Sequence, residues 1–595
     1  MSKVVTKTAA ILTAACLAVG GLSIPAYAAS GYNDFDYITS HVSTWVPQNL
    51  NITRPSKNVK TSATAYYITG NSNPDYNLYI NGEIVANRGK SGSFGVYVSL
   101  NSGDNTFDFT QDTGVAKSIT ITQGSGYGSD LATINNVSSM YPSCNTGELA
   151  GTEVTLQCIA PAGASVTATV NGTSYPMRQV AAAQTGIPAT FKASYTVPSF
   201  GKTTNLGHVK YTLSYNGANK TYTSGGQLFA GGETLLVQVT DPSSSIFAEG
   251  NTSSKFITTA KIGATDYVVG SNSTMYQLGM GGWILKNTTE PLTAGASSNK
   301  VSGVSYKGTA YGERFIFSGT AQPVVTTSRG SDTLTITLHH TTGIDSVSTD
   351  ESKLFTGASV SEENGDTTIT FNRDTNRTLW GYVIEYKDSV TTLYCKYKPT
   401  LSGNSSKPLA GVLVAIDAGH GGSDPGALGI MNGSGISESN ITANTAIAVK
   451  KRLESLGAEV LLEGSGVTAK NKSDYVERMM PAYSNKADFF ISLHCNSIGT
   501  NQNGLKPNGI EIYYYEGNAK AFGNTLLSHM LTETGRASRG VKFSNFRVTL
   551  NSCAPSVLVE MGFITNPKEF DDMASRRGMF NMANAIGDGI IDYLS

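Results

Sequence analysis

Apolar and polar residues alternate in short runs over the first 400 residues, and clusters rich in Gly, Asn and Ser separate these runs. Alternation with a period of two predicts strands with one buried face. Asn81-Gly82 and Asn171-Gly172 lie in or beside such runs, where Asn-Gly predicts a tight hairpin turn. The expected strands lie at residues 66–68, 76–80, 94–100, 106–109, 118–122, 164–170, 191–197, 209–215, 267–269, 275–276, 281–284, 314–318, 333–338, 367–371, 382–386 and 392–397.

The pattern changes at about residue 410. An apolar run is followed by Ala446, Val449, Leu453 and Leu456, whose spacing predicts one face of a helix. Strand and helix patterns then alternate to the end of the chain, which predicts a mostly parallel α/β sheet with a ligand site at the carboxyl ends of its strands. The expected strands are 412–416, 460–462, 489–493, 510–515 and 557–559, and the expected helices are 446–456, 474–484, 519–534 and 579–593.

A chain of 595 residues is too long for one hydrophobic core, and roughly three to five folded units are expected. We predict several all-β modules followed by one α/β domain. The first module resembles bacterial immunoglobulin-like sandwiches in its strands and turns, and the third is similar to small SH3-like barrels. The expected boundaries are 60–124 for the first sandwich, 138–232 for the second, 234–293 for the barrel, 299–400 for a further β module, 401–409 for a linker and 410–595 for the α/β domain.

The amino terminus has the pattern of a secretory signal peptide. Lys3 and Lys7 precede an apolar stretch, and Ala26-Tyr27-Ala28 supplies small residues at a cleavage site. The stretch is short for a membrane span, so we expect residues 1–28 to be removed after export. A secreted, wall-associated protein without stable membrane insertion is the prediction.

The net charge argues against nucleic acid as a partner, and the cysteine content bears on disulfide pairing. The net charge is -1 with 15% charged residues, so no cationic excess is available to neutralise nucleic acid. Removing the leader leaves five of the six cysteines, an odd number that requires a free thiol or an intermolecular bond. Cys144 and Cys158 either pair or stay reduced, and nothing in the sequence decides between these alternatives.

Ionisable residues interrupt or follow the apolar strands of the α/β domain. His420 follows the first strand, His494 follows residues 489–493, Glu560 follows residues 557–559, and Glu438 begins the first helix. Each residue also has a structural interpretation, since a Glu in a first helical turn complements the helix dipole and a loop His is commonly hydrogen-bonded. Together, two imidazoles and a carboxylate at one sheet edge form a known catalytic zinc set.

Four sequence blocks carry a specific resemblance. They occur in order between residues 411 and 595 and are similar to those of the zinc-dependent N-acetylmuramoyl-L-alanine amidases. The blocks are Ile416-Asp417-Ala418-Gly419-His420-Gly421-Gly422-Ser423-Asp424-Pro425-Gly426-Ala427, then Ile491-Ser492-Leu493-His494-Cys495-Asn496-Ser497, then Arg539-Gly540-Val541-Lys542, and finally Pro555-Ser556-Val557-Leu558-Val559-Glu560-Met561-Gly562-Phe563-Ile564-Thr565-Asn566-Pro567. Glu438 matches the family between the first and second blocks.

The resemblance implies a hydrolase that cuts the amide bond between N-acetylmuramate and L-alanine in peptidoglycan. It implies His420, Glu438 and His494 as ligands of Zn²⁺ and Glu560 as the catalytic carboxylate. Separately, the strand pattern of the module at 299–400 and its place just before the catalytic domain are similar to those of the amidase-associated wall-binding module, which implies that this module binds the cell wall. Two positions depart from the family pattern: Ala418 stands where Pro is common, and Leu550 stands where many relatives carry Arg or Lys.

Two other functions are compatible with parts of the sequence: a surface protein that only binds wall, and an esterase or protease. A surface protein with a degenerate amidase domain would bind wall without cutting it, but the complete ligand set and Glu560 argue against this. An esterase or protease would need a nucleophile, and Cys495, next to His494 on a strand, should point to the opposite face of the sheet. His339-His340 makes a poor chelate for the same reason.

Overall fold

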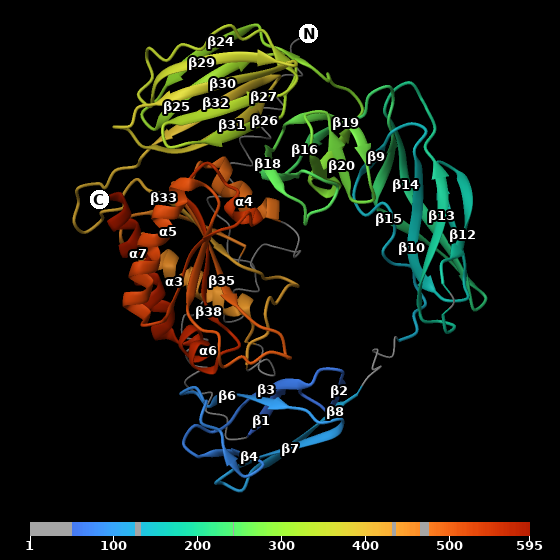
Figure 1. Ribbon diagram of the computed structural model, residues 1–595, viewed down its shortest axis with the longest axis vertical. Coiled ribbons are helices and arrows are strands. Elements are labelled where there is room, and N and C mark those ends of the chain that lie inside the picture. Colours follow the sequence, from blue (N-terminus) through green and yellow to red (C-terminus); the bar gives the residue numbers. More distant parts are fainter. Residues whose placement is uncertain (1–49, 125–131, 182, 242, 431–435, 465–474) are drawn as a thin grey trace, which may run out of the picture.

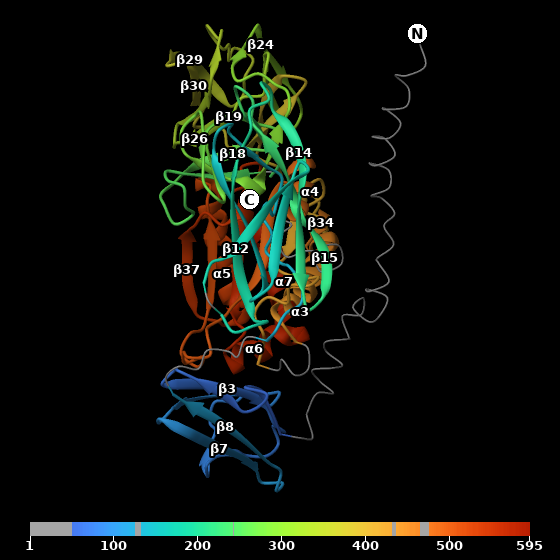
Figure 2. The same ribbon diagram turned by 90° about the vertical axis from the view of Figure 1, so that its right-hand side faces the viewer.

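The computed structural model describes residues 50–124, 132–181, 183–241, 243–430, 436–464 and 475–595. The predicted signal peptide, residues 1–28, lies outside the described residues. Four β-rich modules precede a carboxy-terminal α/β unit, and Figure 1 shows the first module at one end of that unit and the fourth module at the other. The view turned by 90° in Figure 2 shows the same order along the long axis.

Two facing sheets form the first module. Phe94 and Phe109 meet between them with ring centroids 5.3 Å apart, and both are fully buried. Asn81 and Gly82 have positive φ angles of 49° and 85°, as a tight hairpin turn requires. The sheets are β1 (Asn51–Arg54), β3 (Ala65–Asn71) and β6 (Ser93–Ser99), facing β2 (Val59–Thr61), β8 (Ala116–Gln123), β7 (Gly103–Gln111), β4 (Leu78–Ile80) and β5 (Glu83–Ile84).

The second module is built on one seven-stranded sheet. Asn171 and Gly172 again have positive φ at its predicted hairpin, which joins β11 to β12. Cys158 is buried in the core of this module, and both Cys144 and Cys158 are free thiols. The strand order is β10 (Glu153–Pro161), β13 (Pro188–Thr196), β12 (Thr173–Gln179), β11 (Ser165–Val170), β14 (Thr204–Tyr215), β15 (Ala218–Ala230) and β9 (Thr146–Glu148).

The third module is smaller and contains a short 3-10 helix, η3 (Lys286–Thr288). Its strands surround the buried side chains of Ile246, Val268 and Tyr276. The order is β18 (Phe256–Lys261), β17 (Ser243–Phe247), β21 (Trp283–Leu285), β20 (Met275–Leu278), β19 (Thr265–Ser271), β16 (Leu236–Val239) and β22 (Thr289–Leu292).

Two four-stranded sheets and one two-stranded pair form the fourth module. Aromatic rings of Phe315, Phe355 and Phe371 contact one another in its core. The first sheet is β24 (Gly303–Gly308), β25 (Gly312–Ser318), β32 (Val390–Tyr397) and β31 (Leu379–Lys387). The second is β26 (Val325–Arg329), β27 (Thr333–Leu338), β30 (Asp366–Arg373) and β29 (Phe355–Glu363), and the pair is β23 (Asn299–Lys300) with β28 (Thr341–Thr342).

A six-stranded sheet forms the centre of the α/β unit. Its strand pairings are parallel except that between β36 and β38. The order is β34 (Glu459–Glu463), β33 (Leu413–Ala418), β35 (Phe489–Asn496), β38 (Ser556–Phe563), β36 (Ile510–Tyr514) and β37 (Ser538–Phe543). The helices are α3 (Glu438–Ser455), α4 (Tyr475–Ser484), α5 (Gly517–Thr534), α6 (Pro567–Ala574) and α7 (Arg576–Leu594), with a 3-10 turn η5 (Arg547–Thr549).

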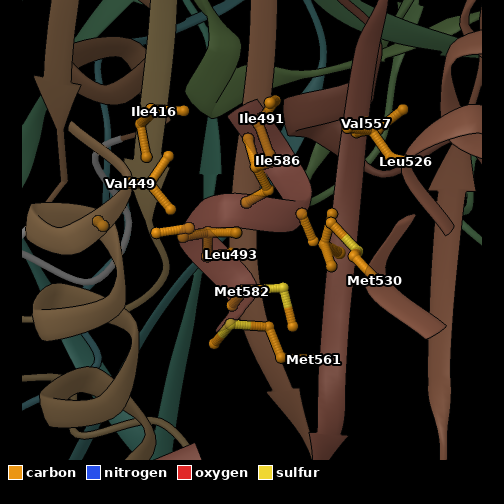
Figure 3. Packing of buried hydrophobic residues seen from close by; sticks show 14 of the residues in the cluster. Ile416, Val449, Ile491, Leu493, Leu526, Met530, Val557, Met561, Met582 and Ile586 are labelled. Atoms are coloured by element: carbon orange, nitrogen blue, oxygen red, sulfur yellow. The ribbon is translucent and has the colours of Figure 1, made fainter. Parts of the chain in front are cut away.

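Alternate residues of the strands divide between the two faces of this sheet. Ile416, Leu493 and Val557 lie on the face covered by α3, α5 and α7, and Figure 3 shows them packed against side chains of these helices. Ala415, Phe490 and Leu558 lie on the other face, against α4 and η5. His494 of β35 and Glu560 of β38 share this second face, because each lies an even number of residues after Phe490 or Leu558. The sequence pattern did not predict β37 or α6.

The fourth module contributes to the core of the α/β unit. Trp380 is 2% exposed and its ring centroid lies 5.2 Å from that of Phe489 and 5.5 Å from that of Tyr593. Its indole Nε1 donates a hydrogen bond of 2.7 Å to the carbonyl of Asp488. Within the stretch predicted as a linker, Leu409 is fully buried in the same core.

The first module contacts loops that follow three strands of the central sheet. The amide of Tyr67 donates to the carbonyl of Thr500 at 2.7 Å, and its hydroxyl donates to the carbonyl of Thr565 at 2.9 Å. Arg54 donates to the carbonyl of Leu428 at 3.0 Å. These loops follow β35, β38 and β33, so the first module lies against the carboxyl edge of the sheet. Within the described ranges, no helix combines the length and apolar character needed to span a membrane.

Candidate metal centre

Four elements bring the predicted site residues together. His420 lies just after β33 with a positive φ of 63°, and Glu438 is the first residue of α3. His494 and Glu560 lie within β35 and β38, which continue beyond them to Asn496 and Phe563. Because His494 pairs with Glu560 in the parallel register, their side chains leave the same face of the sheet.

His420, Glu438 and His494 form the group that can hold a metal ion. One ligand atom from each lies within 4.8 Å of the other two. Glu438 Oε1 is 3.2 Å from His420 Nε2 and 3.1 Å from His494 Nδ1. Two nitrogens and one carboxylate oxygen are the donor set of a catalytic zinc site that keeps a further position for water. Among the described residues, no other group of this kind was found.

Neighbouring groups hold the side chains of His420 and Glu438 in place. Asp424 Oδ2 lies 2.8 Å from His420 Nδ1, so the other ring nitrogen of His420 is directed at the cluster. Glu438 accepts hydrogen bonds from the amides of Ala427 at 2.8 Å and Cys495 at 2.9 Å. Gly426 has a φ of +65°, and a Cβ there would lie 2.6–2.7 Å from His420 and Glu438.

The cluster is electrostatically coupled. Burial alone would lower the pKa of His420, but hydrogen bonds with Glu438 and Asp424 outweigh it and raise the pKa to about 9. Burial would raise the pKa of Glu438, but its bonds with the two imidazoles hold the pKa well below its usual range. Because imidazole binds a metal only in its neutral form, metal uptake is expected to release a proton.

A buried network supports the backbone around His420. Arg478 Nη1 donates to Asp417 Oδ1 at 2.8 Å and to the carbonyl of Ala418 at 2.7 Å, and Nη2 donates to the carbonyl of His420. The Ser492 hydroxyl donates to Asp417 Oδ2 at 2.6 Å. The network therefore stabilises the strained turn on which His420 is presented.

Glu560 is a half-buried residue beside the cluster, and its Oε2 atom is buried. Its Oε2 atom makes no hydrogen bond to any described residue. Burial raises the pKa of Glu560 to about 7; the carboxylates of Glu438 and Glu511 add to this effect, and the imidazoles of His494 and His420 oppose it. A carboxyl with a pKa near neutrality is suited to accept a proton and to return it.

Three residues of this site were not predicted from the sequence. Asp424 stands four residues after His420 in the first block, but the sequence alone assigns it no role. Glu511 interrupts the apolar strand β36 in the same way as Glu560 interrupts β38, and this signal could have identified it. Arg478 gave no such signal, because a cation in an amphipathic helix usually faces solvent.

The surroundings of Cys495 argue against a nucleophile there, and those of His339 and His340 argue against a metal site. Cys495 belongs to the apolar core on the other face of the sheet, and burial raises the pKa of its thiol well above the usual value. His339 and His340 contact different carboxylates, Asp366 and Asp266.

The two departures from the family pattern are both buried. Ala418 ends β33 just before the turn that carries His420. Leu550 is fully buried, and its carbonyl accepts a hydrogen bond from Lys261 of the third module.

The fold and the cluster together define an α/β unit with two histidines and one glutamate, at the carboxyl edge of its sheet, that could hold a metal ion. Residues 414–592 match the model of the N-acetylmuramoyl-L-alanine amidase family. The chain is 35% identical over 197 residues to the uncharacterized protein YqiI of Bacillus subtilis, covering 32% of this chain and 88% of YqiI. The chain therefore belongs, through its α/β unit, to the N-acetylmuramoyl-L-alanine amidase family.

Two further matches each cover 31% of this chain. The amidase LytC of Bacillus subtilis is 34% identical over 190 residues, which is 31% of this chain and 36% of LytC. Among solved structures, the catalytic domain of CwlV, an N-acetylmuramoyl-L-alanine amidase from Bacillus (Paenibacillus) polymyxa, is 33% identical. That match covers 31% of this chain and 98% of the CwlV domain, with a TM-score of 0.28.

The buried carboxyl group of Glu463 is expected to make the free energy of unfolding depend on pH. Glu463 is 6% exposed, and burial, with a further contribution from Asp417, raises its pKa from 4.5 to about 8. The folded state therefore holds this proton more tightly than the unfolded state, so stability falls as pH rises from about 4.5 through 8. At about 1.4 kcal/mol per pKa unit, Glu463→Gln should be more stable than the parent by roughly 2–4 kcal/mol at pH 9.

The measurement is denaturant unfolding of both proteins from pH 4 to pH 9 at a fixed zinc concentration. The stability difference should vanish near pH 4, where Glu463 is protonated in both states. A difference that does not change with pH would show that Glu463 is ionised in the folded protein.

Proposed function

We propose that this protein is an exported peptidoglycan hydrolase that cleaves the amide bond between N-acetylmuramate and L-alanine. The observation that carries the proposal is the convergence of His420, Glu438 and His494 beside the buried, unpartnered Oε2 atom of Glu560. The membership of the α/β unit in the amidase family supports the choice of bond.

The residues present fit a zinc ion. His420, Glu438 and His494 would hold it, and Asp424 fixes the orientation of the His420 ring. Bound zinc would polarise the substrate carbonyl and lower the pKa of a water molecule. Backbone amides donate the hydrogen bonds that position Glu438. They hold its carboxylate group beside the imidazoles of His420 and His494.

Glu560 supplies the proton transfers. Its free Oε2 atom accepts the proton of the attacking water and then donates it to the amine of L-alanine as the C–N bond breaks. Without the second transfer the amine would be a poor leaving group. Burial favours this cycle because it raises the pKa of the carboxyl toward that of the solution.

The β-rich modules are assigned to attachment. We propose that residues 1–28 direct export and that the modules before Ser402 add affinity for peptidoglycan without contributing chemistry. No metal-binding group was found in the described residues of these modules.

Digestion of purified peptidoglycan tests the function. Mass spectrometry should find free stem peptides with an L-alanine amino terminus and glycan with unsubstituted lactyl carboxyl groups. A chelator should abolish the release of peptides, and added zinc should restore it. Cleavage of another bond would contradict the proposed activity, and tight wall binding without any product would indicate a binding protein instead.

A further inference from the structure

A pair of cations contacts Glu511, the residue opposite Glu560 in the sheet. Glu511 of β36 is directly opposite Glu560 of β38 in the antiparallel register, and Gly540 of β37 is opposite Glu511. Directly opposed residues share a face, so His494, Glu560 and Glu511 form one row across three strands. Lys542 pairs with Tyr513 and lies on this face as well.

The carboxylate of Glu511 accepts hydrogen bonds from four side chains. Its Oε1 accepts hydrogen bonds from Asn496 at 2.6 Å and from the Tyr513 hydroxyl at 2.9 Å. Its Oε2 accepts from Arg539 Nε at 3.0 Å and from Lys542 Nζ. Burial alone would raise the pKa of Glu511, but the bonds from Lys542, Tyr513 and Arg539 outweigh it and lower the pKa. Glu511 is therefore ionised and bound to two cations.

This arrangement places two partly exposed cations on one buried carboxylate at the edge of the site. The Glu511 side chain is only 4% exposed, whereas those of Arg539 and Lys542 are 35% and 42% exposed. One carboxylate balances only one of the two cations. Arg539 bonds to Glu511 through Nε and stacks over the Phe563 ring at 4.9 Å, so the guanidinium is held in one orientation. Two fixed and partly exposed cations are suited to bind an anion.

The substrate offers that anion on its peptide side. In uncut peptidoglycan the lactyl carboxyl of muramate is part of the scissile amide and carries no charge, whereas carboxylates occur along the peptide. Glu560 must face the amine that leaves with the peptide, and the cations lie beyond Glu560 in the row that begins at His494. We infer that Arg539 and Lys542 form a carboxylate-binding subsite for the stem peptide, an inference that rests on the proposed function.

Paired substrates test the subsite. Two synthetic muramoyl peptides would differ only in whether the residue after L-alanine carries a carboxylate or a carboxamide. The parent protein should prefer the carboxylate by roughly ten- to a hundredfold in kcat/KM, the range of a charge-assisted hydrogen bond. Arg539→Gln and Lys542→Gln should each reduce this preference, mainly through KM, and hydrolysis of the carboxamide should fall less.

A binding measurement and a matched control complete the experiment. Calorimetry with the free carboxylate peptide should show weaker binding to both variants at unchanged zinc content. Lys520 is an exposed lysine of α5, a helix on the other face of the sheet, and Lys520→Gln should leave preference and binding unaltered. Arg539→Lys keeps the charge and should keep part of the preference; thermal unfolding confirms that each variant is folded.

The outcomes separate the subsite from the proposed function. Hydrolysis without a preference for the carboxylate, or an equal loss on both substrates in the variants, would overturn the subsite and leave the amidase activity intact. Preferential binding of the carboxylate peptide without any hydrolysis would leave the subsite in place and refute the activity.

Discussion

Glu560→Gln is expected to reduce kcat by roughly 10²–10⁴-fold, the range for loss of general acid–base catalysis, and to leave the zinc content unchanged. The substitution preserves shape and volume but removes the atom that accepts the proton. The three metal ligands belong to other positions, so metal binding should persist. The measurement is turnover of a soluble muramoyl peptide together with metal analysis of the same sample.

Two further variants make this result specific. His494→Ala removes a metal ligand and should lower zinc content along with activity. Glu463→Gln changes a buried glutamate of the same sheet, on the edge strand β34, and should retain activity. If Glu560→Gln kept both its zinc and the parent turnover, Glu560 would have no part in the proton transfers.

Trp380→Ala is expected to destabilise the α/β unit by about 3–5 kcal/mol, the usual cost of truncating a buried aromatic residue. The indole is 2% exposed, packs on Phe489 and Tyr593, and donates to the carbonyl of Asp488. Removing it leaves a cavity and an unpaired carbonyl in the core beneath β35. Hydrogen exchange of β35 and α7 would locate the loss, and denaturant unfolding would measure it.

Trp283 provides the comparison. It lies in β21 of the third module and is only partly buried, so Trp283→Ala should cost less and should leave exchange in β35 unchanged. A chain beginning at Lys407 lacks Trp380 and should show the same instability as Trp380→Ala. A stable unit from that truncation would mean that the fourth module is not part of the core.

The hairpins and the cluster of His420, Glu438 and His494 could be predicted because their signals are local. Asn81-Gly82 and Asn171-Gly172 have positive φ angles that few other residue pairs adopt at low energy, so the turn is encoded in two residues. His494 and Glu560 interrupt apolar strands, and parallel strands that end at one edge bring such residues together whatever the details of packing. The predicted cluster of His420, Glu438 and His494 is present in the structure.

Two features could be known only from the tertiary structure: the pairing of residues on neighbouring strands, and the contacts between modules. Glu511 stands opposite Glu560 only because β36 enters the sheet antiparallel to β38, and the alternation of apolar residues does not specify strand direction. Trp380 belongs by sequence to a β module, yet it fills the core of the α/β unit, because burial depends on which surfaces meet in space. The contacts of Tyr67 with the loops after β35 and β38 have the same origin, since they join residues more than 400 positions apart. Residue type and local spacing thus determined which ionisable residues gather at one end of the strands. The packing of the sheets and modules determined which other groups surround those residues.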